Sequence, residues 1–428
     1  MLMSASATAI LQGMSLLMGF ATSILLARFI GGYGYGRYVY AIAWAGLLTT
    51  PAILGLDRFL VRGIAVYGVR EQWSLMKGLL RRTNELVLIT SVVIAAGGCA
   101  VAIGFLGGDL RWTFLIGMLL IPLTTLTLLR QGAMQAIGRV VAGQLPEYLI
   151  RPFLILAAVC VLGTLDRRAL TSTTAIIANV GGVAVAFGVG AVLLRRALPK
   201  VLRTVTPRYE TANWIRASLP MMLISGVWLA NNYLATLVVG TLDGPRAAGV
   251  YSVVEKGAEL IVLVLVAANM PLAPAIARMH AVNDTGGLQH TTERVAQLTL
   301  LVSAPIAAGF AIFPGIYLGI FGPGFQAGAT ALTILALAQL VNAFAGPAGN
   351  VLIMTGHERA AVIGIAAGLV ANVVLGVALV PELGVTGGAI ASGSSLVMWN
   401  TVLVVLARRK VGVNVTALHW LRMVRVPR

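Results

Sequence analysis

Residues 86–105 read LVLITSVVIAAGGCAVAIGF and contain no charged side chain. An α-helix needs about 20 apolar residues to cross a bilayer core that is about 30 Å thick. Lipid offers no hydrogen-bonding partner to the backbone, so a segment this apolar is predicted to be a membrane-spanning helix. The alternation of polar and apolar residues that marks a strand of a membrane barrel is absent from it.

Similar stretches follow one another along the 428 residues, of which 58% are hydrophobic and 11% are charged. A soluble domain carries about 25% charged residues. We therefore predict an all-α polytopic membrane protein with about twelve transmembrane helices. The first span has no basic segment before it, so we expect a retained helix and not a signal peptide. The predicted spans are 7–28, 38–56, 84–106, 112–136, 142–163, 170–194, 217–240, 246–272, 295–313, 326–354, 360–380 and 386–406.

The net charge of +17 follows the predicted topology. Of the 31 Lys and Arg residues, 22 lie after even-numbered spans and 6 after odd-numbered spans. The positive-inside rule then predicts that both termini are cytoplasmic. Arg28 and Arg246 stand at the ends of their spans and are counted with the adjoining loops, and three cations, Arg130, Arg151 and Lys256, lie deeper inside predicted spans. Since most of the charge is explained by topology, no nucleic-acid partner is expected.

Short motifs recur at about half the chain length. Ile94–Gly97 returns as Ile306–Gly309, and Gly36-Arg37-Tyr38 returns as Gly249-Val250-Tyr251. Further matches join Leu193–Arg196 to Leu406–Arg409, and Ala133–Arg139 to Leu352–His357. Six crossings return a chain to its starting side, so the repeat predicts two parallel six-helix lobes. The predicted divisions are a first lobe 1–194, a basic cytoplasmic connector 195–216, a second lobe 217–410 and a cytoplasmic or interfacial tail 411–428.

The charged segment 57–85 carries Trp73, Leu75 and Met76 between basic residues. This pattern predicts a helix in the membrane interface, with its apolar side chains in lipid. The tail 411–428 shows the same pattern and is given the same interpretation.

No motif of a soluble enzyme is present. The chain has no P-loop, and its four histidines lack metal-ligand spacing. We therefore predict no catalytic residue, no metal and no cofactor. A membrane glycosyltransferase or glycan ligase stays an alternative, although such an enzyme usually has a long polar outward loop that is not found here.

Ionisable residues at membrane depth are expensive and are usually paired or face a cavity. Glu147 and Arg151 stand four residues apart and can pair on one helical face. Arg130 has no acidic neighbour in the sequence. It either extends toward the cytoplasmic interface or lines a polar cavity.

Glu255, Lys256 and Glu259 form a second charged group in the eighth predicted span. The group is either an internal salt bridge that fixes helix contacts or part of a cavity. We keep the three acids, Glu147, Glu255 and Glu259, as candidates for ion coupling or structural pairing.

Intramembrane amides complete the set of candidate residues. Gln135, Asn231 and Asn232 either hydrogen-bond between helices or line a hydrated path for sugar hydroxyls. The predicted substrate-binding residues are Arg130, Arg151, Lys256, Gln135, Asn231 and Asn232.

Several stretches together resemble one family. They are Gly34–Tyr38, Leu54-Gly55-Leu56 with Leu60-Val61-Arg62, Gln135–Arg139, Ala248–Tyr251 and Pro381–Ala391. With them the chain resembles the polysaccharide-biosynthesis flippases of the multidrug/oligosaccharidyl-lipid/polysaccharide exporter superfamily.

The resemblance implies two lobes around a central cavity that work by alternating access. It implies an isoprenoid-diphosphate-linked glycan as cargo, moved across the bacterial cytoplasmic membrane for polysaccharide synthesis. The partners it implies are this lipid-linked glycan, membrane lipids, a polysaccharide polymerase and glycosyltransferases. A cation-coupled exporter of drugs or organic cations from the same superfamily stays an alternative. A lipid II flippase is disfavoured, because twelve spans are predicted where that branch has fourteen.

Overall fold

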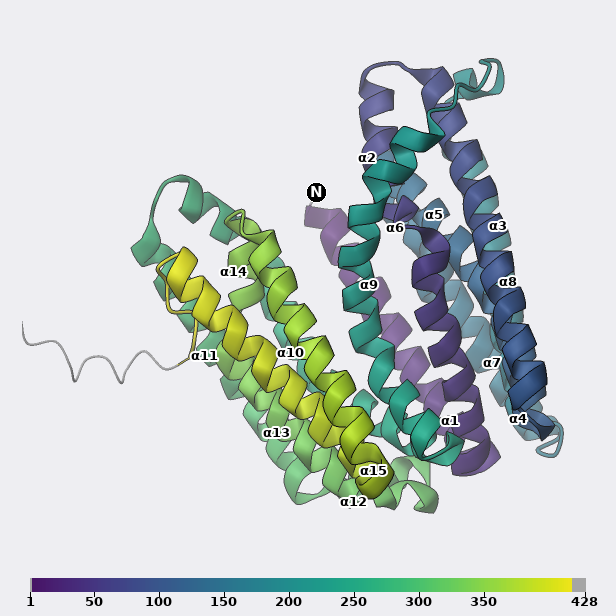
Figure 1. The fold of residues 1–428 in the computed structure, drawn as a ribbon, viewed down its shortest axis with the longest axis vertical. Coiled ribbons are helices and arrows are strands. Elements are labelled where there is room, and N and C mark those ends of the chain that lie inside the picture. The colour runs from purple at the N-terminus through teal and green to yellow at the C-terminus, as the bar shows by residue number, and fades with distance from the viewer. Residues whose placement is uncertain (1, 418–428) are drawn as a thin grey trace, which may run out of the picture. The chain divides into compact units, whose positions relative to one another are not determined.

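The computed structural model describes residues 2–417, and of residues 2–6, 223, 224, 228, 267, 270 and 271 it describes only the backbone. Every regular element in the described chain is a helix (Figure 1), which confirms the predicted all-α fold. Eight of the described helices are long and apolar enough to cross a membrane, or nine if the bent helix α9 is one span. The chain is therefore a multi-pass membrane protein.

The chain divides into two compact units within α9, between Tyr233 and Leu234. Unit 1 contains α1 (Leu2–Ile53), α2 (Leu56–Val69), α3 (Trp73–Phe105), α4 (Gly108–Met118), α5 (Leu120–Ala136), α6 (Val140–Leu145), η1 (Pro146–Ile150), α7 (Arg151–Leu165), α8 (Ser172–Ala197), η2 (Lys200–Arg203) and the start of α9 (Thr211–Leu242). Unit 2 contains the end of α9, α10 (Pro245–Ala281), α11 (Thr285–Ile312), α12 (Pro314–Phe321), η3 (Pro323–Gly328), α13 (Ala329–Ala345), α14 (Ala348–Met354) and α15 (Glu358–Lys410). The domain limits drawn at the connector 195–216, and the central cavity, stay predictions.

Two of these helices are each long enough for two crossings. α1 has 52 residues and is broken at Gly31, and α15 has 53 residues and is broken at Gly384. α15 folds back on itself, because the hydroxyl of Ser395 donates to the carbonyl of Gly368 at 2.6 Å. Gly384 has a φ of +54°, which L-residues with side chains rarely adopt. With α1 and α15 counted twice and α10 included, the described helices accommodate the twelve predicted crossings.

The internal repeat is present in the backbone geometry. Glu71 and Asn283, 212 residues apart, both have a positive φ and stand in turns with matching hydrogen bonds. Gly138 and Gly356, 218 residues apart, end helices in the same way. Each is a left-handed residue after a helix, where glycine is preferred. Units 1 and 2 therefore contain equivalent turns at equivalent places in the chain.

The same repeat appears in side-chain contacts. Asn179 donates to the hydroxyl of Tyr38 at 2.9 Å, and Tyr251 shares a 2.7 Å hydrogen bond with Ser392. Both members of the second pair lie 213 residues after their counterparts in the first. Each hydrogen bond joins two helices of its own unit. An equivalent tyrosine therefore links the corresponding helices in both units.

The prediction that the apolar side chains of segment 57–85 enter lipid is wrong, while the position of the segment at the membrane interface stays a prediction. The segment forms α2 and the first turns of α3, which lie at one end of unit 1 beside the start of α9 (Figure 1). Met76 and Leu79 are buried in a core with Leu202 of the connector and Trp214 of α9. The other apolar side chains, Trp73, Leu75 and Leu80, pack against this core.

Hydrogen bonds hold the connector, residues 195–216, against α3. The Nζ of Lys77 donates to the carbonyls of Arg203 and Val205, and the N–H of Arg208 donates to the carbonyl of Ser74. Gly78 makes this approach possible, because a Cβ there would lie 1.8 Å from the carbonyl oxygen of Arg208.

The first part of the predicted tail packs against unit 2. Val413 and Val415 are buried in the same core as Leu288 of α11. The remainder of the tail, 418–428, lies outside the described residues.

Candidate functional site

Arg130 lies inside unit 1, in the middle of its helices. The residue is 4% exposed on α5, and its Nη1 donates to the carbonyls of Ala186 and Phe187 on α8, at 2.8 and 3.3 Å. Gly190 leaves the space for it, since a Cβ there would lie 1.1 Å from Nη1. Extension toward the interface is therefore wrong for Arg130, because neighbouring helices enclose it.

The ion pair expected between Glu147 and Arg151 is present, through Oε1 and Nη1. Glu147 lies on η1, a turn of π-helix, and Arg151 begins α7. The two side chains are 16% and 25% exposed, so the pair is partly open. Turns of π-helix contain one extra residue and are frequent at functional sites.

Two further residues extend this pair into a chain of hydrogen bonds. The Nη2 of Arg151 donates to Oδ1 of Asn179 at 3.2 Å, and Asn179 in turn donates to Tyr38. Helices α7, α8 and α1 are thereby joined through polar side chains. Neither Asn179 nor Gly190 could be identified from the sequence, because a lone amide or glycine in an apolar span carries no signal of its partner.

Several polar atoms around Arg130 have no hydrogen-bonding partner within the described structure. Three of these atoms are Nε and Nη2 of Arg130 and Oε2 of Glu147. The others are Oγ1 of Thr127, Nε2 of Gln131 and Oε1 of Gln144. They belong to α5, α6 and η1; α6 packs against both of the others, and all three pack against α8. Buried polar groups normally have partners, so these atoms have unused capacity to bind water or a ligand.

We name the following residues the arginine cluster: Arg130, Glu147, Arg151 and Asn179, with Thr127, Gln131 and Gln144 from the same elements. Glu147 links the two arginines, since it pairs with Arg151 and lies close enough to Arg130 to interact with it electrostatically. It contains two guanidinium groups and one carboxylate, a net charge of +1 if all three are ionised. An excess of buried positive charge favours an anion, and guanidinium groups bind phosphate oxygens especially well.

The second charged group lies in unit 2 on α10. Glu255 accepts a hydrogen bond from Thr236 at 2.5 Å, and Glu259 is exposed. Among the described residues no ion pair joins Lys256 to either acid. The salt-bridge interpretation is therefore wrong. Glu255 and Lys256 are neighbours in the chain, so their side chains leave the helix about 100° apart.

The three predicted amides do not join the arginine cluster. Gln135 and Asn232 are exposed, at the end of α5 and on α9. Asn231 donates to the carbonyl of Val227 in its own helix. Their role in substrate binding stays a prediction, as does that of Lys256.

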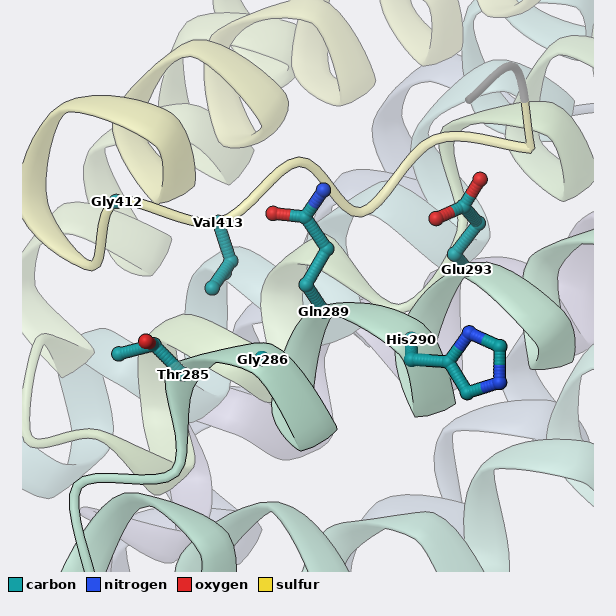
Figure 2. A pocket seen from close by; sticks show the side chains of 7 residues that line it. All are labelled: Thr285, Gly286, Gln289, His290, Glu293, Gly412 and Val413. Atoms are coloured by element: carbon teal, nitrogen blue, oxygen red, sulfur yellow. The ribbon is translucent and has the colours of Figure 1, made fainter. Parts of the chain in front are cut away.

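A pocket of about 310 Å³ lies at the start of α11 in unit 2. Figure 2 shows Gln289, His290 and Glu293 along this helix, with Gly412 and Val413 of the chain after α15 beside them. The N–H of Asn414 donates to Oε1 of Gln289 at 3.4 Å. No predicted site residue lines this pocket, and the described residues include no group suited to a metal ion.

Comparison with known proteins gives both a family and a fold. The family described as polysaccharide biosynthesis protein matches residues 1–280, and the MatE family matches residues 220–378. None of the curated proteins matches the chain.

Three solved structures share the fold. A multidrug resistance MATE family transporter of the MOP superfamily, in an inward-facing conformation, has a TM-score of 0.77 at 15% identity, over 93% of this chain and 94% of its own. The lipid II flippase MurJ has a TM-score of 0.65 at 14% identity, over 95% and 88%. A MOP superfamily transporter from Pyrococcus furiosus has a TM-score of 0.62 at 15% identity, over 95% and 94%.

Proposed function

This chain belongs to the polysaccharide biosynthesis protein family, and from that premise we propose that it moves an isoprenoid-diphosphate-linked oligosaccharide across a bacterial cytoplasmic membrane. Family and fold are those of transporters and not of enzymes, so the glycosyltransferase alternative is set aside. The proposed route is alternating access, with both termini in the cytoplasm. A polysaccharide polymerase and glycosyltransferases would be the partners that use and supply the glycan.

The observation that carries the proposal is the excess positive charge of the arginine cluster. Arg151 is partly open and has Asn179 to fix its orientation, while two nitrogens of Arg130, Nε and Nη2, have no acceptor among the described residues. Two guanidinium groups suit the two phosphates of a diphosphate. An uncharged glycan alone would have no use for them.

The test measures the amount of surface glycan in the source organism after the gene is deleted and the strain is complemented with wild-type or variant genes. R151A should reduce surface glycan by about tenfold or more, because a charge-assisted hydrogen bond contributes roughly 1.5–3 kcal/mol. R208A is the control, since Arg208 is a connector cation whose side chain is 72% exposed. Membrane levels of each variant are measured by immunoblot.

Two results would count against the proposal. If the deletion strain keeps normal surface glycan, the proposed cargo is wrong. If wild-type protein restores the glycan and R151A restores it equally, the cargo stands but Arg151 does not bind it.

A cation-coupled exporter of drugs is the second candidate. The match of the MatE family to residues 220–378 supports it, and so does Glu255, an acid with no ion pair among the described residues of unit 2. An acid of this kind suits a cationic substrate or a coupling ion. Drug accumulation, measured with and without a proton or sodium gradient, separates this candidate from the first: gradient-dependent export with normal surface glycan would support it.

A further inference from the structure

Glu147 places a negative charge beside the cations that are proposed to bind a diphosphate. We propose that Glu147 is an internal competitor of the substrate's anionic head group, holding Arg151 when no head group is bound and releasing it when one binds. This inference rests on the proposed function, because it takes the diphosphate as the ligand of the arginine cluster.

The contacts of Arg151 allow such an exchange. One guanidinium nitrogen, Nη1, binds Glu147, while the other, Nη2, binds Asn179. If Glu147 leaves, Arg151 stays anchored through Asn179 and Tyr38, with Nη1 free for a phosphate oxygen. A carboxylate and a phosphate both accept hydrogen bonds in the plane of a guanidinium group, so they compete for the same nitrogen.

The side chain of Glu147 has a way to move. η1 begins at Pro146, and Pro152 follows Arg151 directly, so neither of these positions has a backbone N–H to donate. The Glu147 side chain is 16% exposed, so a change of its rotamer is enough to take the carboxylate away from Nη1. Arg151 remains bound to Asn179 of α8 during this change.

Neighbouring donors complete the site for a second phosphate. Nε and Nη2 of Arg130 have no described acceptor, and neither has Oγ1 of Thr127. Thr127 and Arg130 are three residues apart and share a face of α5, so their donors point to the same side of the helix. Arg130 itself is 4% exposed and is held in place by α8.

The charges show why the acid and the ligand exclude each other. Each phosphate of a diester carries about one negative charge. Two guanidinium groups balance a diphosphate, but with Glu147 ionised and in place the cluster holds one negative charge too many. Like charges this close repel each other strongly in a partly buried site. Displacement of Glu147 therefore accompanies binding, and its return favours release.

The test is anion binding by the full chain in lipid nanodiscs, with inorganic pyrophosphate and farnesyl diphosphate as probes. E147Q should bind both probes about tenfold more tightly than wild type, because the competing charge is gone. E147D keeps the charge and should bind as wild type does. E85Q is the matched control, since Glu85 also pairs with arginines in unit 1 but lies outside the arginine cluster.

The outcomes separate this inference from the proposed function. Unchanged or weaker binding in E147Q, with a monodisperse protein by size-exclusion chromatography, overturns the competition. Surface glycan that depends on the wild-type gene would leave the proposed function intact in that case. Conversely, tighter binding in E147Q together with normal glycan in the deletion strain supports the competition and removes the glycan cargo. Tighter binding with lower glycan export in E147Q supports both.

Discussion

At the scale of single residues, the absence of a side chain at Gly190 determines where the guanidinium group of Arg130 lies. Gly190 has no side chain, and Nη1 of Arg130 fills the space where a Cβ would be. Gly188 lies on the same helix and has nothing within 4 Å of a Cβ position. Substitution of Gly190 by alanine therefore tests this contact, and the same substitution of Gly188 is the control.

G190A should displace Arg130 and destabilise the protein by about 1–3 kcal/mol, the usual result of adding an atom to a packed interior. G188A should leave stability unchanged or raise it by roughly 0.5–1 kcal/mol, since alanine favours a helix over glycine. Thermal unfolding of both variants in detergent measures the difference. Equal melting temperatures would show that Arg130 does not occupy this space.

The sequence predicts the depth of Arg130 and its lack of an acidic neighbour in the chain. It cannot predict the partner, because Gly190 and the carbonyls of α8 carry no charge or motif that marks them. The Glu147–Arg151 pair is different: its four-residue spacing is a local property of one helix, and it was predicted correctly. The π-turn beneath it has no such local signal.

The docked connector is the feature to test at the scale of elements. Gly78 allows the carbonyl of Arg208 to approach α3, so G78A should release the connector from α3. We expect trypsin to cleave after Arg203 and Arg208 several times faster in G78A, because cleavage requires an exposed and flexible backbone. G97A, on the same helix with no atom within 4 Å of its Cβ position, is the control. Equal cleavage rates in the two variants would contradict the contact.

Helix limits show where sequence patterns stop being informative. Hydropathy predicted a span from 84 to 106, whereas α3 begins at Trp73. The additional turns, 73–83, precede the apolar stretch of the helix and pack in a small core with Leu202 and Trp214. Amphipathic residues suit a lipid interface or a protein core equally well, and only the tertiary contacts distinguish the two.

Topology is the property to test at the scale of the whole molecule. The distribution of Lys and Arg predicts that Glu71 and Asn283 face the cytoplasm, and that Asp166 and Asp243 face outward. In a variant without the two native cysteines, single cysteines at the outward positions should react with a membrane-impermeant maleimide in intact cells. Those at the cytoplasmic positions should react only after permeabilisation. Reaction of E71C in intact cells would overturn the orientation.

The all-α fold and the repeat were the parts of the whole molecule that the sequence predicted best. Motifs such as Gly36-Arg37-Tyr38 and Gly249-Val250-Tyr251 are short, but their common offset pointed to equivalent structure. The tyrosines of both motifs make equivalent hydrogen bonds.

Turns and tyrosine contacts that recur 212 to 218 residues apart are what duplication of a gene for half the chain would leave behind. If each half crosses the membrane six times, as the sequence predicts, its second copy inserts the same way round with no change in its flanking charges. Each copy could then diverge by single substitutions. Asn179 and Ser392 occupy the same place, but only the amide has a second polar atom, and that atom holds Arg151. The same position thus joins a charged pair in unit 1 and an uncharged amide, Asn372, in unit 2.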